Sequence, residues 1–344
     1  MDSGAINICT GPVRISEAVK AALANDPVSH RSTAFLDSYH ATTELLCDLF
    51  NVKHAYLLTG SGTLANEALL HQVKHISGKG LILSNGEFGN RLIKQAERIG
   101  LRFSTHSLPW GEGFQPIEIE ELLVNSSPAW MVFTHCETST GVVNDLDGLA
   151  KLANSHHCVC FADCMSTVGT RPIDLSGVAM ATASSGKGLA SIPGLAMVFS
   201  NIEPVSGNQI PSYMDLEQYA CNAGIPFTIS SNQVCALHAS LKQKLVKDQY
   251  ALLEKYRKKI SALLQQAHLA PFNHQYSFVF TVVPPADEYG DVLEQLLRSG
   301  LIVSYESDYL KKRGWIQLAL FNYYQEDELI NVVKRLKKLR ILSY

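Results

Sequence analysis

The sequence predicts an α/β fold, in which a mostly parallel sheet flanked by helices is followed by a smaller C-terminal α+β domain. Short apolar runs alternate with segments of helical periodicity from about residue 55 to residue 200, which is the order of βαβ units. Several of these runs are apolar throughout, as expected of parallel strands that helices cover on both faces. After about residue 205 a long helical stretch precedes shorter strands, and this change marks the second domain.

The large domain is expected to alternate strands and helices along the chain. Its helices carry apolar residues three and four positions apart, as at Leu64, Ala68 and Leu69. The expected strands are His54–Thr59, Gly80–Ser84, Ala129–His135, Cys158–Asp163, Ala179–Ser184 and Leu195–Ser200, and the expected helices are Thr63–Ile76, Asn90–Ile99 and Leu146–Ser155.

The smaller domain is expected to begin with a long linking helix, so we divide the chain into residues 1–235 and 236–344, with the N-terminal segment contributing to the small domain or to the active site. The last helix interleaves leucine and valine with lysine and arginine, which favours an amphipathic helix with a solvated basic face over a nucleic-acid patch. The expected elements are a helical stretch over Ser231–Ala267, strands at Tyr276–Val283, Leu301–Tyr305 and Trp315–Phe321, and helices at Glu288–Arg298 and from about Glu326.

Composition excludes several classes of protein. The chain has 344 residues, 46% of them apolar and 18% charged, and a formal net charge of -3, which argues against disorder and against a basic nucleic-acid binder. No secretory signal precedes the first elements, and no apolar run reaches the roughly 20 residues that cross a bilayer. The eight cysteines lack the spacing of a disulfide framework or a zinc site, so we expect free thiols, no metal and a cytoplasmic location.

The shortage of charge is local. Residues 131–240 contain 11 charged side chains in 110 positions, whereas residues 241–344 contain 27 in 104. An average domain carries about 25% charged residues, so only the first of these stretches is depleted. We interpret it as the place where the sheet core, the active-site cleft and a subunit interface coincide.

A glycine loop, Gly60-Ser61-Gly62-Thr63, follows an expected strand and opens an expected helix. Backbone N–H groups in such a turn, with the partial positive charge of the helix N-terminus, form a cradle for a phosphate group. Through Ala65 the string also fits the G-x-G-x-x-A form of a dinucleotide-binding turn. A plain strand-to-helix turn explains the loop equally well.

Asp163 and Lys187 follow two different expected strands and are 24 residues apart. Both would emerge at the carboxyl edge of the sheet, where open α/β folds bind ligands, and the glycine loop would share that edge. A lysine, a carboxylate and a phosphate cradle fit pyridoxal phosphate (PLP): the amine forms a Schiff base, and the aspartate keeps the ring nitrogen protonated. The alternative is that Asp163 caps a turn and Lys187 lies on the surface.

These motifs, in this order, resemble the class V aminotransferases of the PLP fold type I group, and in particular the 2-aminoethylphosphonate, alanine–glyoxylate and serine–glyoxylate aminotransferases. The resemblance runs from Thr10-Gly11-Pro12 to the final helix and makes residues 1–235 the PLP-binding domain. Its motifs are His30-Arg31-Ser32, the glycine loop, Asn85-Gly86-Glu87-Phe88-Gly89, His135-Cys136-Glu137-Thr138-Ser139-Thr140-Gly141, Asp163, and Lys187 followed by Pro193-Gly194.

The resemblance implies a role for each matching residue. Lys187 is the Schiff-base lysine and Asp163 is the partner of the pyridine nitrogen. The aromatic ring of Phe88 stacks on the cofactor, and Thr138 lies near its phenolic oxygen, with Ser139 or Thr140 as substitutes. The remaining cofactor contacts are with the phosphate: Ser61, Gly62 and Thr63 of the same subunit and, across a homodimer interface, Thr228.

Two positions depart from the family pattern. Gln317 stands where relatives have an arginine that binds the substrate's acid group, and a glutamine cannot form that charged fork. Either Arg313 or Arg31 takes over, or the substrate lacks an acid at that point. Gly186 also replaces an Asn or Gln that contacts phosphate, so backbone groups would hold more of the cofactor.

We therefore expect a homodimeric PLP-dependent aminotransferase that moves an amino group from a small amine or amino acid to a keto acid. The alternative with the same cofactor is a lyase or decarboxylase that acts on an unusual amine. A nicotinamide-dependent oxidoreductase is a weaker alternative, because it leaves Lys187 and Asp163 unexplained. We expect no nucleic-acid or membrane partner.

Overall fold

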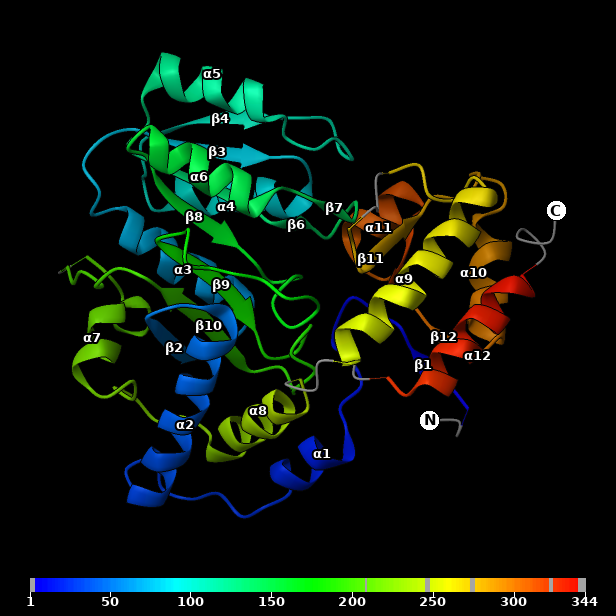
Figure 1. The fold of residues 1–344 in the computed structure, drawn as a ribbon, viewed down its shortest axis with the longest axis horizontal. Coiled ribbons are helices and arrows are strands. Elements are labelled where there is room, and N and C mark those ends of the chain that lie inside the picture. Colours follow the sequence, from blue (N-terminus) through cyan, green and yellow to red (C-terminus); the bar gives the residue numbers. More distant parts are fainter. Residues whose placement is uncertain (1–3, 208, 245–247, 273–275, 322–323, 340–344) are drawn as a thin grey trace.

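The computed structural model describes residues 4–207, 209–244, 248–272, 276–321 and 324–339. Within them, Figure 1 shows a large part built around one sheet and a smaller C-terminal part beside it. No helix of the described chain is long and apolar enough to cross a membrane.

The central sheet has seven strands in the order β2-β10-β9-β8-β5-β3-β4. Strand β10 runs antiparallel to both of its neighbours, and the other pairs in the sheet are parallel. A mixed, mostly parallel sheet is what the sequence predicts. The strands are β2 (His54–Thr59), β3 (Gly80–Ser84), β4 (Phe103–Ser107), β5 (Trp130–Thr134), β8 (Val159–Asp163), β9 (Met180–Ser184) and β10 (Leu195–Ser200).

Helices cover both faces of this sheet, because alternate side chains of each strand point to opposite faces. In β10, Ala196 and Val198 join one apolar cluster, and Leu195, Met197 and Phe199 join the other. The first cluster lies under α3 (Gly62–Val73), α4 (Glu87–Arg98) and α7 (Leu216–Cys221); the second lies under α2 (Thr33–Phe50), α5 (Pro116–Ser126), α6 (Leu146–Ser155) and α8 (Ser231–Lys244).

The C-terminal part has its own core, built on a short antiparallel pair of strands, β11 (Val279–Val282) and β13 (Ile316–Ala319). Around this pair pack α9 (Asp248–Gln266), α10 (Tyr289–Arg298), β12 (Leu301–Ile302), α11 (Asp308–Arg313) and α12 (Glu326–Lys337). The remaining elements of the chain are β1 (Ile6–Asn7), α1 (Glu17–Leu23), β6 (Cys136–Glu137), β7 (Val142–Val143) and a 3₁₀ turn at Ser212–Met214.

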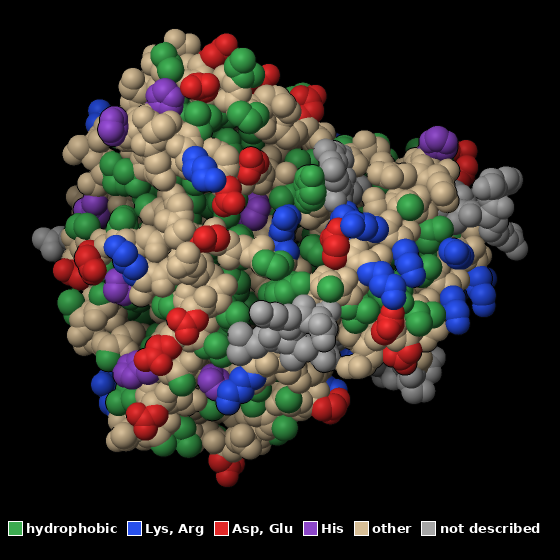
Figure 2. All heavy atoms as spheres, in the orientation of Figure 1, with side chains coloured by type: hydrophobic (Ala, Val, Ile, Leu, Met, Phe, Trp, Pro, Cys, Tyr) green, Lys and Arg blue, Asp and Glu red, His purple; other side chains and the backbone are tan. Residues whose placement is uncertain are grey.

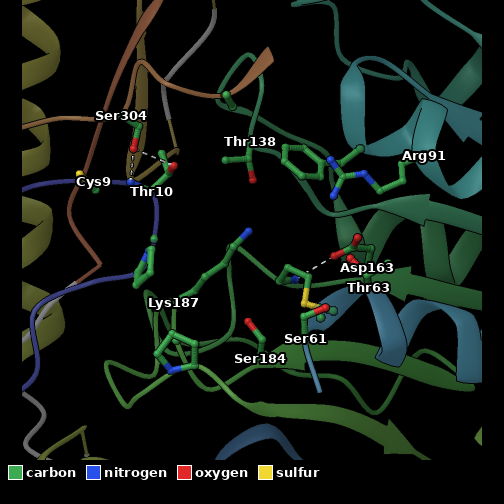
Figure 3. Close-up of a pocket in the computed structure, with 18 of the residues that line it drawn as sticks. Cys9, Thr10, Ser61, Thr63, Arg91, Thr138, Asp163, Ser184, Lys187 and Ser304 are labelled. Carbon is green, nitrogen blue, oxygen red and sulfur yellow. Dashed lines mark hydrogen bonds between the residues drawn. The ribbon is translucent and has the colours of Figure 1, made fainter. Parts of the chain in front are cut away.

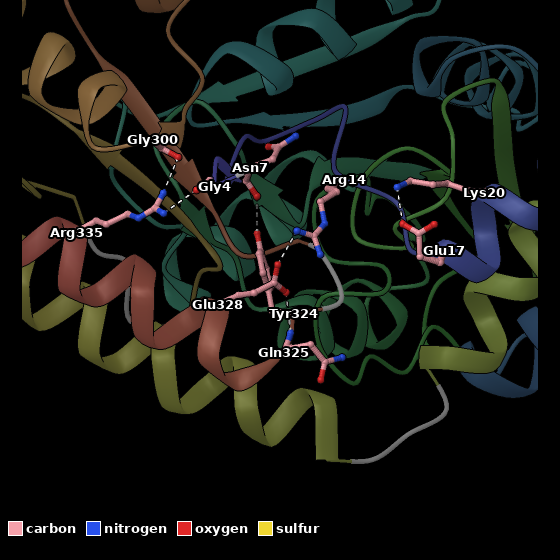
Figure 4. Close-up of polar contacts among 10 residues, drawn as sticks. All are labelled: Gly4, Asn7, Arg14, Glu17, Lys20, Gly300, Tyr324, Gln325, Glu328 and Arg335. Atoms are coloured by element: carbon pink, nitrogen blue, oxygen red, sulfur yellow. Dashed lines mark hydrogen bonds and ion pairs between the residues drawn. The ribbon is translucent and has the colours of Figure 1, made fainter. Parts of the chain in front are cut away.

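The N-terminal segment belongs to this second core. Strand β1 pairs in parallel with β12, and Ile6 and Ile8 are buried in the C-terminal cluster. Polar contacts fix the segment from outside (Figure 4): the Tyr324 hydroxyl donates to the Asn7 carbonyl at 3.0 Å, and Arg14 pairs with Glu328 at 2.5 Å. The N-terminal segment is thereby held against the C-terminal part.

The boundary between the two parts stays a proposal. It was expected at residue 235, which falls inside α8, and the buried side chains of α8 pack in the large part. The expected helical stretch over 231–267 contains two helices, α8 and α9, and residues 245–247 between them lie outside the described residues. We therefore place the boundary after α8.

The last helix is amphipathic, as predicted. Leu329, Val332 and Leu336 are buried, whereas Lys334 and Lys337 are exposed. Figure 2 shows Lys and Arg side chains gathered over this part of the molecule.

Candidate active site

A cavity of about 850 Å³ lies at the carboxyl edge of the central sheet, between the large part and the C-terminal part (Figure 3). The large part contributes the loop between β2 and α3, the end of β8, the start of α4 and the loop after β9. The chain around Thr10 and the segment from Val303 to Tyr309 contribute the opposite side. Its volume lies within the range of typical small-molecule sites, about 300–1,000 Å³.

Parallel pairing explains why the candidate residues meet. Asp163 is the last residue of β8 and lies opposite Thr134 of β5 and Thr182 of β9. Lys187 follows β9 by three residues, in a turn. Since both strands point their carboxyl ends to the same edge, the two side chains line one cavity, together with Ser61, Gly62 and Thr63.

The glycine loop ends at the N-terminus of α3, which begins at Gly62. Ser61 is the N-cap residue, but its hydroxyl does not cap the helix and instead lines the cavity. Gly62 packs directly on Met165, and a Cβ there would collide with the Met165 sulfur. The loop therefore presents hydroxyls and a helix N-terminus to the cavity, which are the groups that hold a phosphate.

Asp163 is buried, and both of its carboxylate oxygens accept hydrogen bonds. The Asn66 amide donates to Oδ2 at 2.8 Å, and the backbone N–H of Met165 donates to Oδ1 at 2.9 Å. The Thr182 hydroxyl in turn donates to the Asn66 side-chain oxygen at 2.5 Å, which fixes the orientation of the amide. This network holds the carboxylate in one position at the edge of the cavity.

Lys187 is surrounded by protein, although its side chain borders the open cavity. Its Nζ donates to the Ser166 hydroxyl at 3.2 Å, and that hydroxyl lies 2.5 Å from the Thr138 hydroxyl. Burial lowers the pKa of Lys187, and the nearby charge of Asp163 opposes that shift. A lysine with a lowered pKa is more readily a neutral amine, and hence a nucleophile or a base.

Phe88 lies near the amine: the Lys187 Nζ is 5.4 Å from the centroid of its ring. Phe88 sits in the first turn of α4, whose N-terminal N–H groups have no partners within the helix. Buried Glu137 accepts hydrogen bonds from the N–H groups of Phe88 and Gly89, at 3.1 and 3.0 Å, and Ser139 accepts from the N–H of Glu87 at 3.1 Å. The motif around Glu137 thus positions Phe88.

Four of the sequence candidates do not line the cavity. Gln317 is fully buried behind it: its amide nitrogen donates to the Thr138 carbonyl and to the Thr281 hydroxyl, and its oxygen accepts from the Tyr309 hydroxyl at 2.8 Å. The others are exposed: Arg31 lies ahead of α2, Arg313 stacks on Trp110 with 3.8 Å between the guanidinium carbon and the ring centroid, and Thr228 precedes α8.

Sequence reasoning missed three residues that matter here. Asn66 and Arg91 lie within expected helices, where a polar residue is ordinarily solvated, and Tyr309 lies in the unpredicted helix α11. Each of them lines the cavity. A signal was available only for Arg91, which follows Phe88 by one helical turn and so shares its face.

The chain is similar in sequence to the proteins of one family. The family described as aminotransferase class-V matches residues 15–204. A 2-aminoethylphosphonate–pyruvate transaminase of Pseudomonas fluorescens is 36% identical over 200 residues, covering 55% of this chain and 54% of that protein. This chain therefore spans about half the length of that relative.

Solved structures agree in fold over nearly the whole chain. An aspartate aminotransferase of subgroup IV from Thermus thermophilus superposes with a TM-score of 0.87 at 25% identity, covering 98% of this chain and 99% of that one. A ureidoglycine–glyoxylate aminotransferase from Bacillus subtilis, at 20% identity, gives 0.85 and covers 98% and 93%.

Proposed function

Because the chain belongs to the class-V aminotransferase family, we propose that it is a PLP-dependent aminotransferase that moves an amino group from a small amine or amino acid to a keto acid. The observation that carries this proposal is the convergence of Lys187, Asp163 and the glycine loop on one cavity. The name of the Pseudomonas relative makes 2-aminoethylphosphonate one amino donor to test.

The residues that line the cavity fit PLP. Ser61, Gly62 and Thr63 would hold its phosphate, Asp163 would face its ring nitrogen, and Phe88 would cover its ring. When bound, PLP supplies an aldehyde that reacts with amines and a conjugated ring that takes up the electron pair of the substrate's Cα–H bond.

The chain's own residues would bind and orient the reacting groups and would move protons between them. The Lys187 amine, oriented by Ser166, would take the proton from the substrate α-carbon and deliver it to the cofactor carbon that carried the aldehyde, which is the proton transfer that transamination requires. Its lowered pKa suits this task, because a neutral amine is the base. Asp163, fixed by Asn66, keeps a negative charge at the end of β8 that stabilises a positive charge facing it.

Two further parts of the proposal concern assembly and location. We infer a homodimer in which Thr228 contacts the partner's cofactor phosphate; its support is the exposure of Thr228 within the charge-poor stretch of residues 131–240. We also infer a cytoplasmic protein, supported by eight free cysteines, four of them buried.

The test begins with the visible spectrum of protein purified with PLP. A yellow protein is expected, and after borohydride reduction and digestion the cofactor should be found on the peptide that carries Lys187. Lys187→Ala should lose this attachment, whereas Lys151→Ala, an exposed lysine of α6, should keep it. A colourless protein that takes up no PLP contradicts the proposal.

The reaction type needs a second measurement. The loaded protein is mixed with single amines, amino acids and aminophosphonates in the absence of a keto acid. Conversion of the cofactor to its aminated form together with a carbonyl product identifies transamination. Release of ammonia without aminated cofactor, or of carbon dioxide, identifies the lyase or decarboxylase that Gln317 leaves open.

A further inference from the structure

The cavity wall carries two cationic side chains among the residues that the structure describes, Lys187 and Arg91. Lys187 is assigned above. Arg91 comes from α4 and, in Figure 3, extends from that helix into the cavity. Its guanidinium carbon lies 4.8 Å from the centroid of the Phe88 ring, so one face of the guanidinium is covered by an aromatic side chain.

The Arg91 guanidinium has no hydrogen bond or ion pair within the described part of the chain. A guanidinium offers five N–H donors in a planar fork that matches a carboxylate or phosphonate. A half-buried arginine whose donors meet no protein acceptor, and which faces a cavity, is placed to bind an anion from solution.

Gln317 cannot take this role, because its hydrogen-bonding groups are already engaged by Thr138, Thr281 and Tyr309. Instead it holds the hydroxyl of Tyr309, whose ring lies 6.2 Å from that of Phe88 and lines the same cavity. The residue at the family's arginine position therefore shapes the wall that Arg91 faces.

The charges on the rest of the wall direct an anion toward Arg91. Glu306 lines the cavity from the C-terminal part; burial raises the pKa of the nearby Cys9 thiol, and the Glu306 carboxylate adds to that rise. Asp163 occupies the end of β8. An anionic group is repelled from both carboxylates and attracted to the guanidinium.

On the basis of the proposed function, we propose that Arg91 binds the anionic group of the amino donor, so that the substrates are short amines that carry a carboxylate or a phosphonate. The Lys187 Nζ and the Arg91 guanidinium carbon lie 5.4 and 4.8 Å from the same ring centroid, and hence no more than about 10 Å apart. Contacts of about 3 Å at each end leave at most about 4 Å, so a substrate with no more than two or three bonds of about 1.5 Å between its amine and its acid group fits between them.

The experiment uses the PLP-loaded protein and the variants Arg91→Met and Arg91→Lys. Arg98→Met is the matched control, because Arg98 lies on the same helix, is exposed and does not line the cavity. Calorimetry measures binding of two unreactive anions, methylphosphonate and acetate. Single-turnover kinetics compare 2-aminoethylphosphonate, β-alanine and n-propylamine, which are of similar length and differ in the acid.

Arg91→Met should weaken binding of the anion, and raise the concentration of the matching amine that gives half the maximal single-turnover rate, by about 10- to 100-fold with a smaller change in the maximal rate, because it removes a charged hydrogen bond. Arg91→Lys should recover part of the loss, and Arg98→Met should match the unaltered protein. The anion that binds more tightly shows whether the amino donor carries a carboxylate or a phosphonate.

Three results would overturn the proposal: neither anion binds the unaltered protein, Arg91→Met binds both as tightly, or Arg91→Met slows n-propylamine as much as the acids. The last result would mean that Arg91 acts only through Phe88, and a changed cofactor spectrum or PLP affinity would accompany it. Failure of the proposed function is distinct, because the unaltered protein would then take up no PLP, or would release ammonia or carbon dioxide without forming the aminated cofactor.

Discussion

The two sides of the cavity differ in how closely they follow the family. The sheet wall, formed by Gly60–Thr63, Asp163 and Lys187, lies within the matched residues 15–204, and its one departure from the expected groups is Gly186. The C-terminal wall, formed by Val303–Ser307 and Tyr309, lies beyond them, and behind it Gln317 replaces the expected arginine.

The difference follows from how each wall is built. Parallel strands deliver their carboxyl ends to one edge, so residues that follow strands meet wherever the sheet forms. The C-terminal wall is a connecting segment between β12 and α11, and its shape depends on side-chain contacts such as that between Tyr309 and Gln317. The groups proposed for the chemistry therefore rest on the topology of the sheet, whereas the C-terminal wall takes its shape from individual side-chain contacts.

The largest effect is expected from Asp163→Asn, a substitution in the sheet wall. The substitution keeps the size of the side chain but removes its negative charge, so the rate of the amine half-reaction should fall by at least about 100-fold, the scale of a lost charge at a reacting centre. The pKa of Lys187 should also fall further, because Asp163 supplies the charge that raises it. Stopped-flow spectra across a pH series measure both.

Asp147→Asn, at an exposed carboxylate in the first turn of α6, is the matched control and should leave rate and pH profile unchanged. An Asp163→Asn protein that reacts within threefold of the unaltered one would show that this carboxylate is only a structural cap.

A substitution that disrupts the C-terminal wall should lower the free energy of unfolding rather than abolish the amine half-reaction. Gln317→Leu removes three hydrogen bonds at a fully buried position, so the free energy of unfolding should fall by about 1–3 kcal/mol. Urea denaturation of the protein without cofactor measures this loss. Gln265→Leu, on the exposed face of α9, should stay within about 0.5 kcal/mol.

An unchanged Gln317→Leu protein would mean that the Tyr309 side chain is held by other contacts. The C-terminal wall would then be free to adjust, and the contrast between the two walls would weaken.

The sequence predicted the sheet wall better than the C-terminal wall for a physical reason. Strands β2 and β10 were expected at their observed bounds, because apolar runs between turn residues identify buried strands. Strand β4 was missed, because Phe103–Ser107 is largely polar and has no fully buried residue, so it lacks the apolar run of a buried strand. Asn66 was missed because its partner, Asp163, is 97 residues away, and only the folded sheet brings them together.

The last effect concerns the floor of the sheet wall, where His135 follows β5 and its backbone N–H donates to the Asp163 carbonyl at 2.9 Å. Burial, aided by the charge of Arg171, lowers the pKa of His135 from 6.5 to about 3. In the unfolded chain His135 binds a proton below about pH 6.5, whereas in the folded chain it does so only near pH 3, so stability falls as the pH falls between these values.

Buried Glu137, whose pKa is raised, contributes to the pH dependence of stability with the opposite sign. Glu137 is present both in the unaltered protein and in the variant His135→Gln, so its contribution cancels when their free energies of unfolding are subtracted. Between pH 6 and pH 4, urea denaturation should show that the unaltered protein loses up to about 1.4 kcal/mol of this free energy per pH unit relative to the variant. Parallel stability curves would show that His135 takes up its proton without unfolding, and that the floor beneath Asp163 is open to water.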